Sequence, residues 1–394
     1  MARAHRDDRS MTPPVREQLT DWLALALAPG LGPRRISQLV AQFGSAAAVR
    51  AADRTALLEA GAPKAAIAAV KSPDRNRVEH ALAWADRPIA HLLTPDLSNY
   101  PQRLRELPAA PPLLFVLGNT DLLHEPQIAI VGSRNPTAGG IATARDFAAH
   151  LAGLGLVITS GLALGIDAAA HQGALGTGHT IAVLGTGPDR VYPAAHRELA
   201  RRIAAGGALV SEFPPGTGPQ ASHFPRRNRI IAGLSLGTLV VEAAVGSGSL
   251  ITARLASEQG REVFAIPGSI HNPLARGCHA LIRQGAKLVD SANQILEELD
   301  AQLQAYLDAT PDTTGIEAES TQRHEEALDD DHRRLLSAMG YDPTAPDDLI
   351  ARTGLPAFEI ASMLLLLELQ GYVVSHAGGR FSRSGTPPQP SADA

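Results

Sequence analysis

The fold class is decided by residues 127–161, QIAIVGSRNPTAGGIATARDFAAHLAGLGLVITSG. A continuous apolar run, QIAIVG, is followed by an alanine-rich stretch of helical length and then by a second apolar run, LVITSG. Continuous apolar strands that alternate with helices are typical of a parallel sheet covered on both faces. This segment therefore predicts a strand–helix–strand unit of a doubly wound α/β domain.

Further runs repeat the pattern of the first two. They are LLFVLG (113–118), TIAVLG (180–185), ALVSE (208–212), TLVVEA (238–243) and VFAIPG (263–268). Segments of helical length separate most of them, so we expect a Rossmann-like, doubly wound, mostly parallel sheet over residues 91–298. Ligands of such sheets bind beyond the carboxyl ends of the strands, so the residues that follow these runs are the candidates for a site.

Two smaller domains are expected on either side of the sheet. Residues 17–90 show helical periodicity and predict a small helical domain of the SAM or helix-hairpin-helix type, with Gly30-Leu31-Gly32 between two helices. Such a hairpin can offer backbone N–H groups to a phosphate, but it also suits an ordinary turn, and we favour a structural role. Residues 331–385 predict three helices and a hairpin, which is the pattern of a winged helix.

The remaining segments are expected to lack a core. Residues 1–16 and 386–394 are interpreted as disordered ends, and the polar, acidic residues 299–330 as a linker. We expect neither a secretory signal nor a transmembrane helix, because no apolar stretch of the required length is present. The single cysteine, Cys278, excludes an internal disulfide and a CxxC metal site and fits a cytoplasmic protein.

The formal net charge of −5 hides a separation of charge along the chain. Residues 126–290 carry 14 Lys and Arg against 9 Asp and Glu, whereas residues 291–394 carry 6 against 18. A basic surface indicates an anionic partner. On charge alone, the simpler interpretation is that the basic and the acidic regions are both solvent-exposed surfaces without a partner. The composition, 44% hydrophobic and 19% charged over 394 residues, is that of a globular protein with two or three domains.

The first candidate site residues follow the run QIAIVG. Gly132 permits a sharp turn, after which Ser133 and Arg134 face whatever lies above the sheet. Gly139 and Gly140 open the next helix, whose N-terminus favours an anion. This is not the GxGxxG fingerprint, and no acidic residue closes LVITSG to hold a ribose, so no dinucleotide cofactor is expected.

The second candidate segment, SGLALGIDAAAH, follows the run LVITSG. Ser160 and Gly161 can offer backbone N–H groups, and Asp167 is expected to cap or orient the following helix. His171 is interpreted as a satisfied helical histidine rather than a ligand or a catalyst, because no carboxylate or second histidine is spaced to assist it.

The third candidate segment is FPRRNR, at the start of an apolar helical stretch. Its polar side chains are those of Arg226, Arg227, Asn228 and Arg229. Pro225 suits the first helical position, so the arginines lie in the first turn, where cations oppose the helix dipole. A bound phosphate would remove that conflict, since guanidinium and backbone N–H groups both bind its oxygens. We expect the first two arginines to bind an anion and the third to pair with Glu212 or Glu242.

The fourth candidate segment is the loop Gly246-Ser247-Gly248-Ser249, which precedes a predicted helix and can cradle a phosphate. It lacks the lysine of a P-loop, and the chain shows neither paired carboxylates beside a nucleophile nor a metal-ligand cluster. We therefore predict a binding protein without a catalytic centre, metal or cofactor. The alternative is a nucleotide-hydrolysing enzyme of the lysine-decarboxylase-like Rossmann group, with Glu242 as its catalytic carboxylate.

In this order, the motifs VGSR, SGLALGID, SEFPPG, FPRRNRIIAGLS, VVEAAVGSGSLITA and GCHALIRQGA closely resemble the DprA/Smf family, DNA processing protein A. The resemblance implies a cytoplasmic bacterial protein that binds single-stranded DNA, protects incoming strands in natural transformation and loads the RecA recombinase onto them. It also implies a homodimer formed through the Rossmann-like domain. Candidate dimer segments are residues 230–237 and 274–282, although core packing would explain both equally well.

The resemblance and the residues together define a candidate strand-binding set. It consists of Gly132, Ser133, Arg134, Ser160, Gly161, Phe224, Arg226, Arg227, Asn228, Arg229, Ser247, Gly248, Ser249 and Thr252. Aromatic residues make up only 4% of the chain, so Phe224 and Tyr192 are the candidates for stacking on bases. Binding is therefore expected to be mostly electrostatic, independent of base sequence and weakened by salt.

Two positions depart from the family pattern. Leu164 stands where many relatives have a basic residue, which removes one expected phosphate contact, and His279 stands where many have asparagine. The predicted recognition helix of the winged helix, LPAFEIASMLLLLELQ, contains two glutamates and no lysine or arginine. A helix that reads duplex DNA needs polar or basic side chains toward the groove, so we expect this domain to pack on a partner or on the basic domain instead.

Overall fold

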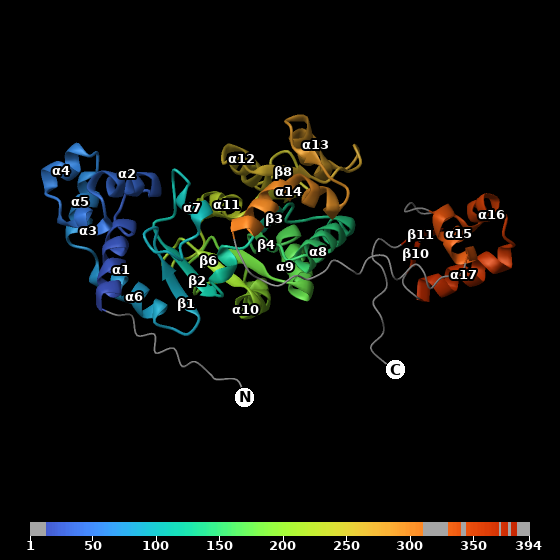
Figure 1. Ribbon diagram of the computed structural model, residues 1–394, viewed down its shortest axis with the longest axis horizontal. Coiled ribbons are helices and arrows are strands. Elements are labelled where there is room, and N and C mark those ends of the chain that lie inside the picture. Colours follow the sequence, from blue (N-terminus) through green and yellow to red (C-terminus); the bar gives the residue numbers. More distant parts are fainter. Residues whose placement is uncertain (1–12, 310–329, 340–343, 370–371, 377–379, 384–394) are drawn as a thin grey trace. The chain divides into compact units, whose positions relative to one another are not determined.

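The computed structural model describes residues 13–309, 330–339, 344–369, 372–376 and 380–383 (Figure 1). The chain divides into two compact units at residue 310. Most of the predicted linker and the C-terminal tail lie outside the described residues. Among the described residues, no helix is both long and apolar enough to cross a membrane.

Six helices form the N-terminal helical domain of the first unit. They are α1 (Pro13–Ala26), α2 (Pro33–Phe43), α3 (Ala46–Ala51), α4 (Arg54–Glu59), α5 (Lys64–Lys71) and α6 (Arg75–Ala85). Helix α1 thus begins inside the segment that was expected to be a disordered end. Trp84 packs edge-on against Phe115 of strand β2 (Leu114–Gly118), with 5.5 Å between the ring centroids. The core of the helical domain is therefore continuous with one edge of the sheet.

The sheet has nine strands in the order β1-β2-β6-β5-β4-β3-β7-β8-β9. Besides β2, the strands are β1 (Ala90–Leu93), β3 (Gln127–Val131), β4 (Val157–Ser160), β5 (Thr180–Val183), β6 (Ala208–Ser211), β7 (Gly237–Val240), β8 (Glu262–Ala265) and β9 (Lys287–Leu288). The pairs from β6 through β9 are parallel, whereas β1–β2 and β2–β6 are antiparallel. This confirms the predicted Rossmann-like, mostly parallel sheet. The chain reverses its direction of winding between β3 and β7, which creates a topological switch point.

Helices cover both faces of the sheet. One face carries α8 (Ala138–Gly153), α9 (Ile166–Thr177), α10 (Arg197–Gly206) and α14 (Ala292–Ala309). The other carries α7 (Gln102–Arg105), α11 (His223–Leu234), α12 (Ser249–Glu258) and α13 (Arg276–Arg283). Along β3, Ile128 and Ile130 pack against the first set, while Ala129 and Val131 pack against the second. Continuous apolar strands are required here because successive side chains enter two different cores.

Helix α14 continues to Ala309, into the range for which the composition indicated a linker. Leu299 is fully buried against the sheet, and Leu303 packs on the same core. The hydroxyl of Tyr306 donates a hydrogen bond to the Glu125 carboxylate at 2.8 Å. Apolar residues at helical spacing therefore keep this acidic segment on the domain.

The second unit is a winged helix with its own core, as predicted. Its elements are α15 (Asp330–Met339), α16 (Pro346–Thr353), α17 (Ala357–Leu369), β10 (Val373–His376) and β11 (Arg380–Arg383). Leu335, Leu349, Ile360, Leu367 and Val373 form part of its core. The exposed residues described on α17 are Ala357, Ala361, Ser362 and Leu366. None of these is a cation, so the absence of duplex DNA binding stays a prediction with a physical basis.

His171 lies on α9, completely buried between the helix and the sheet. The Thr180 hydroxyl donates its proton to the carbonyl oxygen of Ile158, so the Nδ1–H group of His171 must donate to the Thr180 oxygen at 2.7 Å. The Nε2 atom has no partner among the described residues. Burial, aided by the charges of His196 and Arg227, lowers the pKa of His171 from 6.5 to about 3. The histidine is therefore a neutral core residue, but with one ring nitrogen unpartnered among the described residues it is not the satisfied histidine that was predicted.

We expect this histidine to make the first unit less stable in acid. The unfolded chain takes up a proton at this side chain below about pH 6.5 and the folded chain does not, so each further pH unit lowers the free energy of unfolding by up to about 1.4 kcal/mol. Urea unfolding of the wild type and of His171→Gln between pH 7 and pH 5 measures the effect. The variant should show a flatter profile, whereas His80→Gln, at an exposed position, should follow the wild type. Equal slopes for His171→Gln and wild type would contradict the assignment.

Candidate functional site

A cavity of about 570 Å³ opens at the switch point, beyond the carboxyl ends of the strands. The segments after β3, β4 and β7 contribute to its wall, together with the starts of α11 and α12. Ten members of the candidate set line it: Gly132, Ser133, Arg134, Phe224, Arg227, Asn228, Ser247, Gly248, Ser249 and Thr252. Ser160, Gly161, Arg226 and Arg229 are not among the lining residues. Four segments far apart in the sequence therefore meet at one edge of the sheet.

The turn after β3 requires glycine and presents Arg134 to solvent. A Cβ atom on Gly132 would lie 2.7 Å from Ile166 Cγ1 and 2.9 Å from the carbonyl oxygen of Glu242, so a larger residue does not fit. Arg134 is exposed, and its guanidinium carbon lies 5.8 Å from the centroid of the Phe224 ring. No carboxylate pairs with Arg134 in the part of the chain that the structure describes. This arginine is thus a cation at the cavity mouth that an external anion can neutralise.

Arg227 was predicted to bind an anion, but in the structure its side chain is buried and bonded internally. It is only 4% exposed, and its guanidinium donates hydrogen bonds to the carbonyl oxygens of Gly161 and Val183. Burial lowers the pKa of Arg227 to about 10, against the opposing effect of Asp167. The side chain stays charged at neutral pH, but its visible hydrogen bonds are internal. Its role in the cavity wall is to fix the loops after β4 and β5.

Asp167 is the buried counterpart of this arginine. One of its carboxylate oxygens accepts hydrogen bonds from the backbone N–H groups of Gly161, at 3.1 Å, and Ala163, at 3.2 Å. Burial raises the pKa of Asp167, while the charge of Arg227 lowers it. Asp167 therefore orders the segment between β4 and α9, but it does not cap α9, whose N-cap has no side-chain hydrogen bond. Asp167 was not in the candidate strand-binding set, although its position directly after a glycine-rich turn was a signal for it.

Ser160 and Gly161 serve the interior rather than the cavity. The hydroxyl of Ser160 donates to the carbonyl oxygen of Ile130 at 2.6 Å, and both residues are buried. A Cβ atom on Gly161 would lie 2.4 Å from Nη1 of Arg227. Glycine is needed here because the guanidinium packs directly against the backbone.

Helix α11 begins at His223, two residues before Pro225, so its arginines lie in the second turn and not, as predicted, in the first. Glu212 holds two of these arginines. Its Oε2 atom accepts hydrogen bonds from Nη2 of Arg226, at 2.9 Å, and Nη2 of Arg229, at 2.6 Å. The pairing of Arg229 with Glu212 agrees with the prediction, but that of Arg226 was not expected. The Arg226 side chain remains 45% exposed and lies over the Phe213 ring, 5.2 Å from its centroid. Both arginines face a neighbouring cavity.

The Gly-Ser loop closes the opposite side of the site. The hydroxyls of Ser247 and Ser249 lie 2.7 Å apart, and the side-chain amide of Asn228 reaches the carbonyl oxygen of Gly248 at 3.4 Å. Helix α12 begins at Ser249, with Gly248 at its N-cap, and the backbone N–H of Ser249 donates to the Ser247 hydroxyl at 3.3 Å. The N-terminus of α12 therefore faces the cavity with its positive dipole end, next to hydroxyl donors.

Glu242 is engaged in the fold rather than free for catalysis. Its two carboxylate oxygens accept hydrogen bonds from the backbone N–H of Thr137, at 2.9 Å, and from the Thr137 hydroxyl, at 2.7 Å. Gly140 packs so closely that a Cβ atom there would lie 2.6 Å from the carboxylate. This carboxylate anchors the start of α8. Within the described ranges, no group of three or more His, Cys, Asp and Glu residues could hold a metal ion.

The aromatic residues expected to stack on bases lie beside the cavity. Tyr192 is 50% exposed, and its ring centroid lies 5.6 Å from that of Phe224, at an interplanar angle of 45°. Leu164 is also exposed, so a basic residue there would add a cation at this edge. His279 bonds the carbonyl oxygen of Gly268 at 3.0 Å through its Nε2 atom. Phe224 and Arg134 therefore line the cavity itself, and Tyr192 contacts the Phe224 ring at its edge.

The fold and the site define a Rossmann-like protein with a cavity at the switch point of its sheet. The family profile described as "DNA recombination-mediator protein A" matches residues 91–300, and the profile "DprA winged helix domain" matches residues 319–379. The chain belongs to the DprA/Smf family.

Individual relatives agree with this assignment. Protein Smf of Escherichia coli is 46% identical over 77% of this chain and 80% of its own length. DNA processing protein DprA of Streptococcus pneumoniae is 52% identical over 51% of this chain and 71% of its own length. The X-ray structure of DprA from Streptococcus pneumoniae has a TM-score of 0.61 and 38% identity, and it covers 71% of this chain and 97% of the solved one.

Proposed function

We propose that this protein binds single-stranded DNA in the switch-point cavity and acts in DNA processing during natural transformation. The observation that carries the proposal is the exposed Arg134, which pairs with no carboxylate among the described residues, beside the Phe224 ring in the same cavity as the start of α12. A cation and an aromatic surface are parts that a strand needs for its phosphates and bases. The names of the relatives, DNA processing protein and recombination mediator, support the same conclusion.

The cavity favours a binder over the alternative enzyme. The carboxylate considered for catalysis, Glu242, already accepts two hydrogen bonds from Thr137 at the start of α8. The carboxylate that does line the cavity, Asp167, is bound to two backbone N–H groups and lies beside Arg227. A general acid or base must reach its substrate's proton, and these geometries do not offer one.

Fluorescence anisotropy of labelled oligo-dT across a salt series tests the proposal. Binding should weaken steeply with salt, because each phosphate neutralised releases counterions. Salt-independent binding, or no binding, would contradict a strand-binding role. Incubation with nucleoside monophosphates and assay for free base is the companion experiment, and release of base would favour the enzyme instead.

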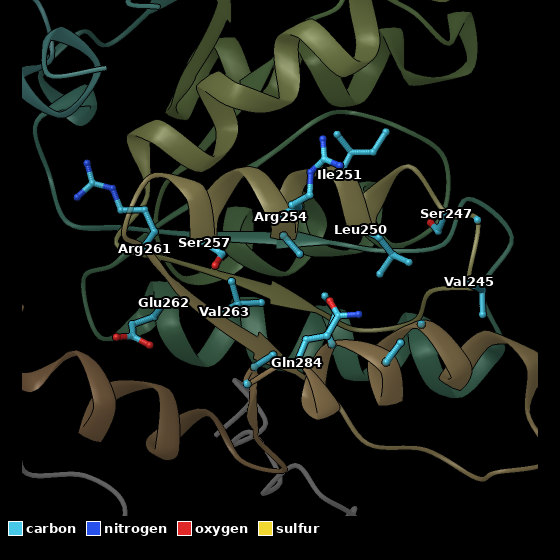
Figure 2. Close-up of a pocket in the computed structure, with 17 residues that line it drawn as sticks. Val245, Ser247, Leu250, Ile251, Arg254, Ser257, Arg261, Glu262, Val263 and Gln284 are labelled. Carbon is cyan, nitrogen blue, oxygen red and sulfur yellow. The ribbon is translucent and has the colours of Figure 1, made fainter. Parts of the chain in front are cut away.

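We further propose that the protein protects incoming strands, loads RecA onto them and acts as a homodimer. Of the two dimer segments considered, residues 230–237 are buried in the core, which leaves residues 274–282. A groove of about 620 Å³ runs between α12 and α13, with Leu250, Val263 and Leu281 in its wall. Figure 2 shows Leu250 and Gln284 pointing into it from opposite sides. This partly apolar groove supports the proposal that the dimer forms here.

We expect Val245→Asp to weaken this dimer. Val245 is 67% exposed at the groove, so the substitution should leave the monomer folded while it places a charge in an apolar interface. Size-exclusion chromatography with light scattering should show a shift toward the monomer mass at micromolar concentration. Leu154→Asp, at an exposed leucine away from the groove, is the control. A dimer unaffected by Val245→Asp would place the interface elsewhere.

A further inference from the structure

A second cavity, of about 470 Å³, lies between the helical domain and the start of α11. Its lining residues come from the hairpin before α2, from the segment after α7 and from α11. They are Gly30, Gly32, Pro33, Arg34, Arg35, Gln38, Ala109, Arg226 and Arg229. The lining thus contains four arginines and no acidic residue. Such a concentration of cations requires either a carboxylate behind it or an anion in front.

One carboxylate lies behind two of the arginines. Glu212 is 1% exposed at its side chain and binds Arg226 and Arg229 through the same oxygen. Its negative charge therefore offsets only one of the two guanidinium charges. The Nη1 atom of Arg229 is buried and has no hydrogen-bond partner in the described part of the chain. The Arg226 side chain is 45% exposed and that of Arg229 is 13% exposed, so an anion in the cavity would contact their accessible guanidinium atoms and not the buried Nη1 atom.

The other two arginines have no countercharge. Arg34 and Arg35 are exposed in the first turn of α2, and neither forms a hydrogen bond or ion pair through its side chain within the described ranges. The N-cap residue, Gly32, supplies no side-chain cap. Cations in the first turn of a helix oppose its dipole. The hairpin that the sequence suggested as a structural turn carries a Pro-Arg-Arg sequence, as the FPRRNR segment does.

We propose that this second cavity binds backbone phosphates of the same DNA strand, so that a strand seated in the switch-point cavity continues around the start of α11 to the hairpin before α2. The two cavities share the second turn of α11: Arg227 and Asn228 line one, and Arg226 and Arg229 line the other. A polymer with a phosphate at every nucleotide matches two cationic cavities on either side of one helix. The inference rests on the proposed single-strand binding and adds the helical domain to the binding surface.

The experiment compares Arg34→Ala/Arg35→Ala with wild type on oligo-dT of about 6 and about 20 nucleotides, lengths that bracket the usual footprint of a single-strand site. We expect equal affinity for the short oligonucleotide and a loss of about tenfold for the long one. The slope of log affinity against log salt for the long one should decrease by about 1.4, because two phosphate contacts are removed. Arg34→Lys/Arg35→Lys should retain most of that slope. Arg75→Ala/Arg77→Ala is the matched control, since it removes two exposed arginines from the first turn of α6.

The other outcomes overturn the inference. Equal affinity of the double alanine variant and wild type for the long oligonucleotide would show that the strand does not reach the hairpin. An equal loss at both lengths, or the same loss in the control, would indicate a general charge effect. A gain in affinity would indicate that an acidic segment of the chain occupies this cavity. If wild type bound neither oligonucleotide, the proposed single-strand binding itself would fail. If only the inference about the second cavity is wrong, wild type should still bind the short oligonucleotide.

Discussion

Arg227→Met lowers the free energy of unfolding of the first unit by about 3–5 kcal/mol, because it leaves a buried partner without its countercharge. The wild-type guanidinium donates to the carbonyl oxygens of Gly161 and Val183 and lies beside the buried carboxylate of Asp167. Methionine fills part of the space but leaves those acceptors unpaired. Both tryptophans of the chain, Trp22 and Trp84, lie in the first unit, so their fluorescence in urea reports on this unit alone.

The loss should depend on pH in a defined direction. Burial already raises the pKa of Asp167, and removal of Arg227 removes the charge that opposes this increase. A carboxyl group whose pKa is higher in the folded than in the unfolded state binds a proton more tightly when folded, so its protonation stabilises the folded state. The difference in unfolding free energy between Arg227→Met and wild type should therefore shrink as the pH falls. Arg254→Met is the control: its side chain is 72% exposed and, within the described residues, pairs only with Glu258, so the change should stay within about 0.5 kcal/mol. A deficit for Arg227→Met as small as that control would contradict the internal role of Arg227.

Arg134→Ala is expected to lower the affinity for oligo-dT by about tenfold to a hundredfold near 0.1 M salt, which is the effect of one lost charge-assisted hydrogen bond. The salt slope should fall by about 0.7, because one phosphate contact of a single strand is removed. Stability should not change, since Arg134 is exposed and pairs with no carboxylate among the described residues. Anisotropy titrations at several salt concentrations measure both quantities.

Two further variants make this result specific. Arg134→Lys keeps the charge and should preserve the slope while it loses part of the affinity, because an ammonium cannot bind a phosphate through two donors. Arg145→Ala removes an exposed arginine of α8 whose guanidinium donates a hydrogen bond to the side chain of Gln172 on α9, and the affinity for oligo-dT should not change. An Arg134→Ala variant that bound as wild type would place the strand outside this cavity. Substitution of Arg227 is unsuited to the same test because it would also change folding.

Much of the site follows from strand order alone. Loops after parallel strands meet at one edge of the sheet, so Ser133 after β3 and Ser247 after β7 were predicted to lie together, and the cavity contains both. The alternation of apolar runs and helices predicted the sheet, because a strand covered on two faces must be apolar throughout. The acidic range from residue 299 was predicted to be a linker from its composition. Its first part is instead helical, because a few apolar side chains of α14 pack on the core of the sheet.

What the sequence by itself determined is the parallel sheet, the edge at which the cavity lies and the presence of cations there, because these depend on local patterns and chain order. Only the tertiary structure decided what each arginine of FPRRNR does. Neighbouring residues on a helix point about 100° apart, so Arg226 and Arg227 face different surroundings although the sequence places them as equivalents. Arg227 enters the sheet edge and meets carbonyl oxygens, whereas Arg226 reaches Glu212 and a second cavity. Which side chain remains free for an anion depends on the partners that packing brings to it, and sequence spacing does not contain that information.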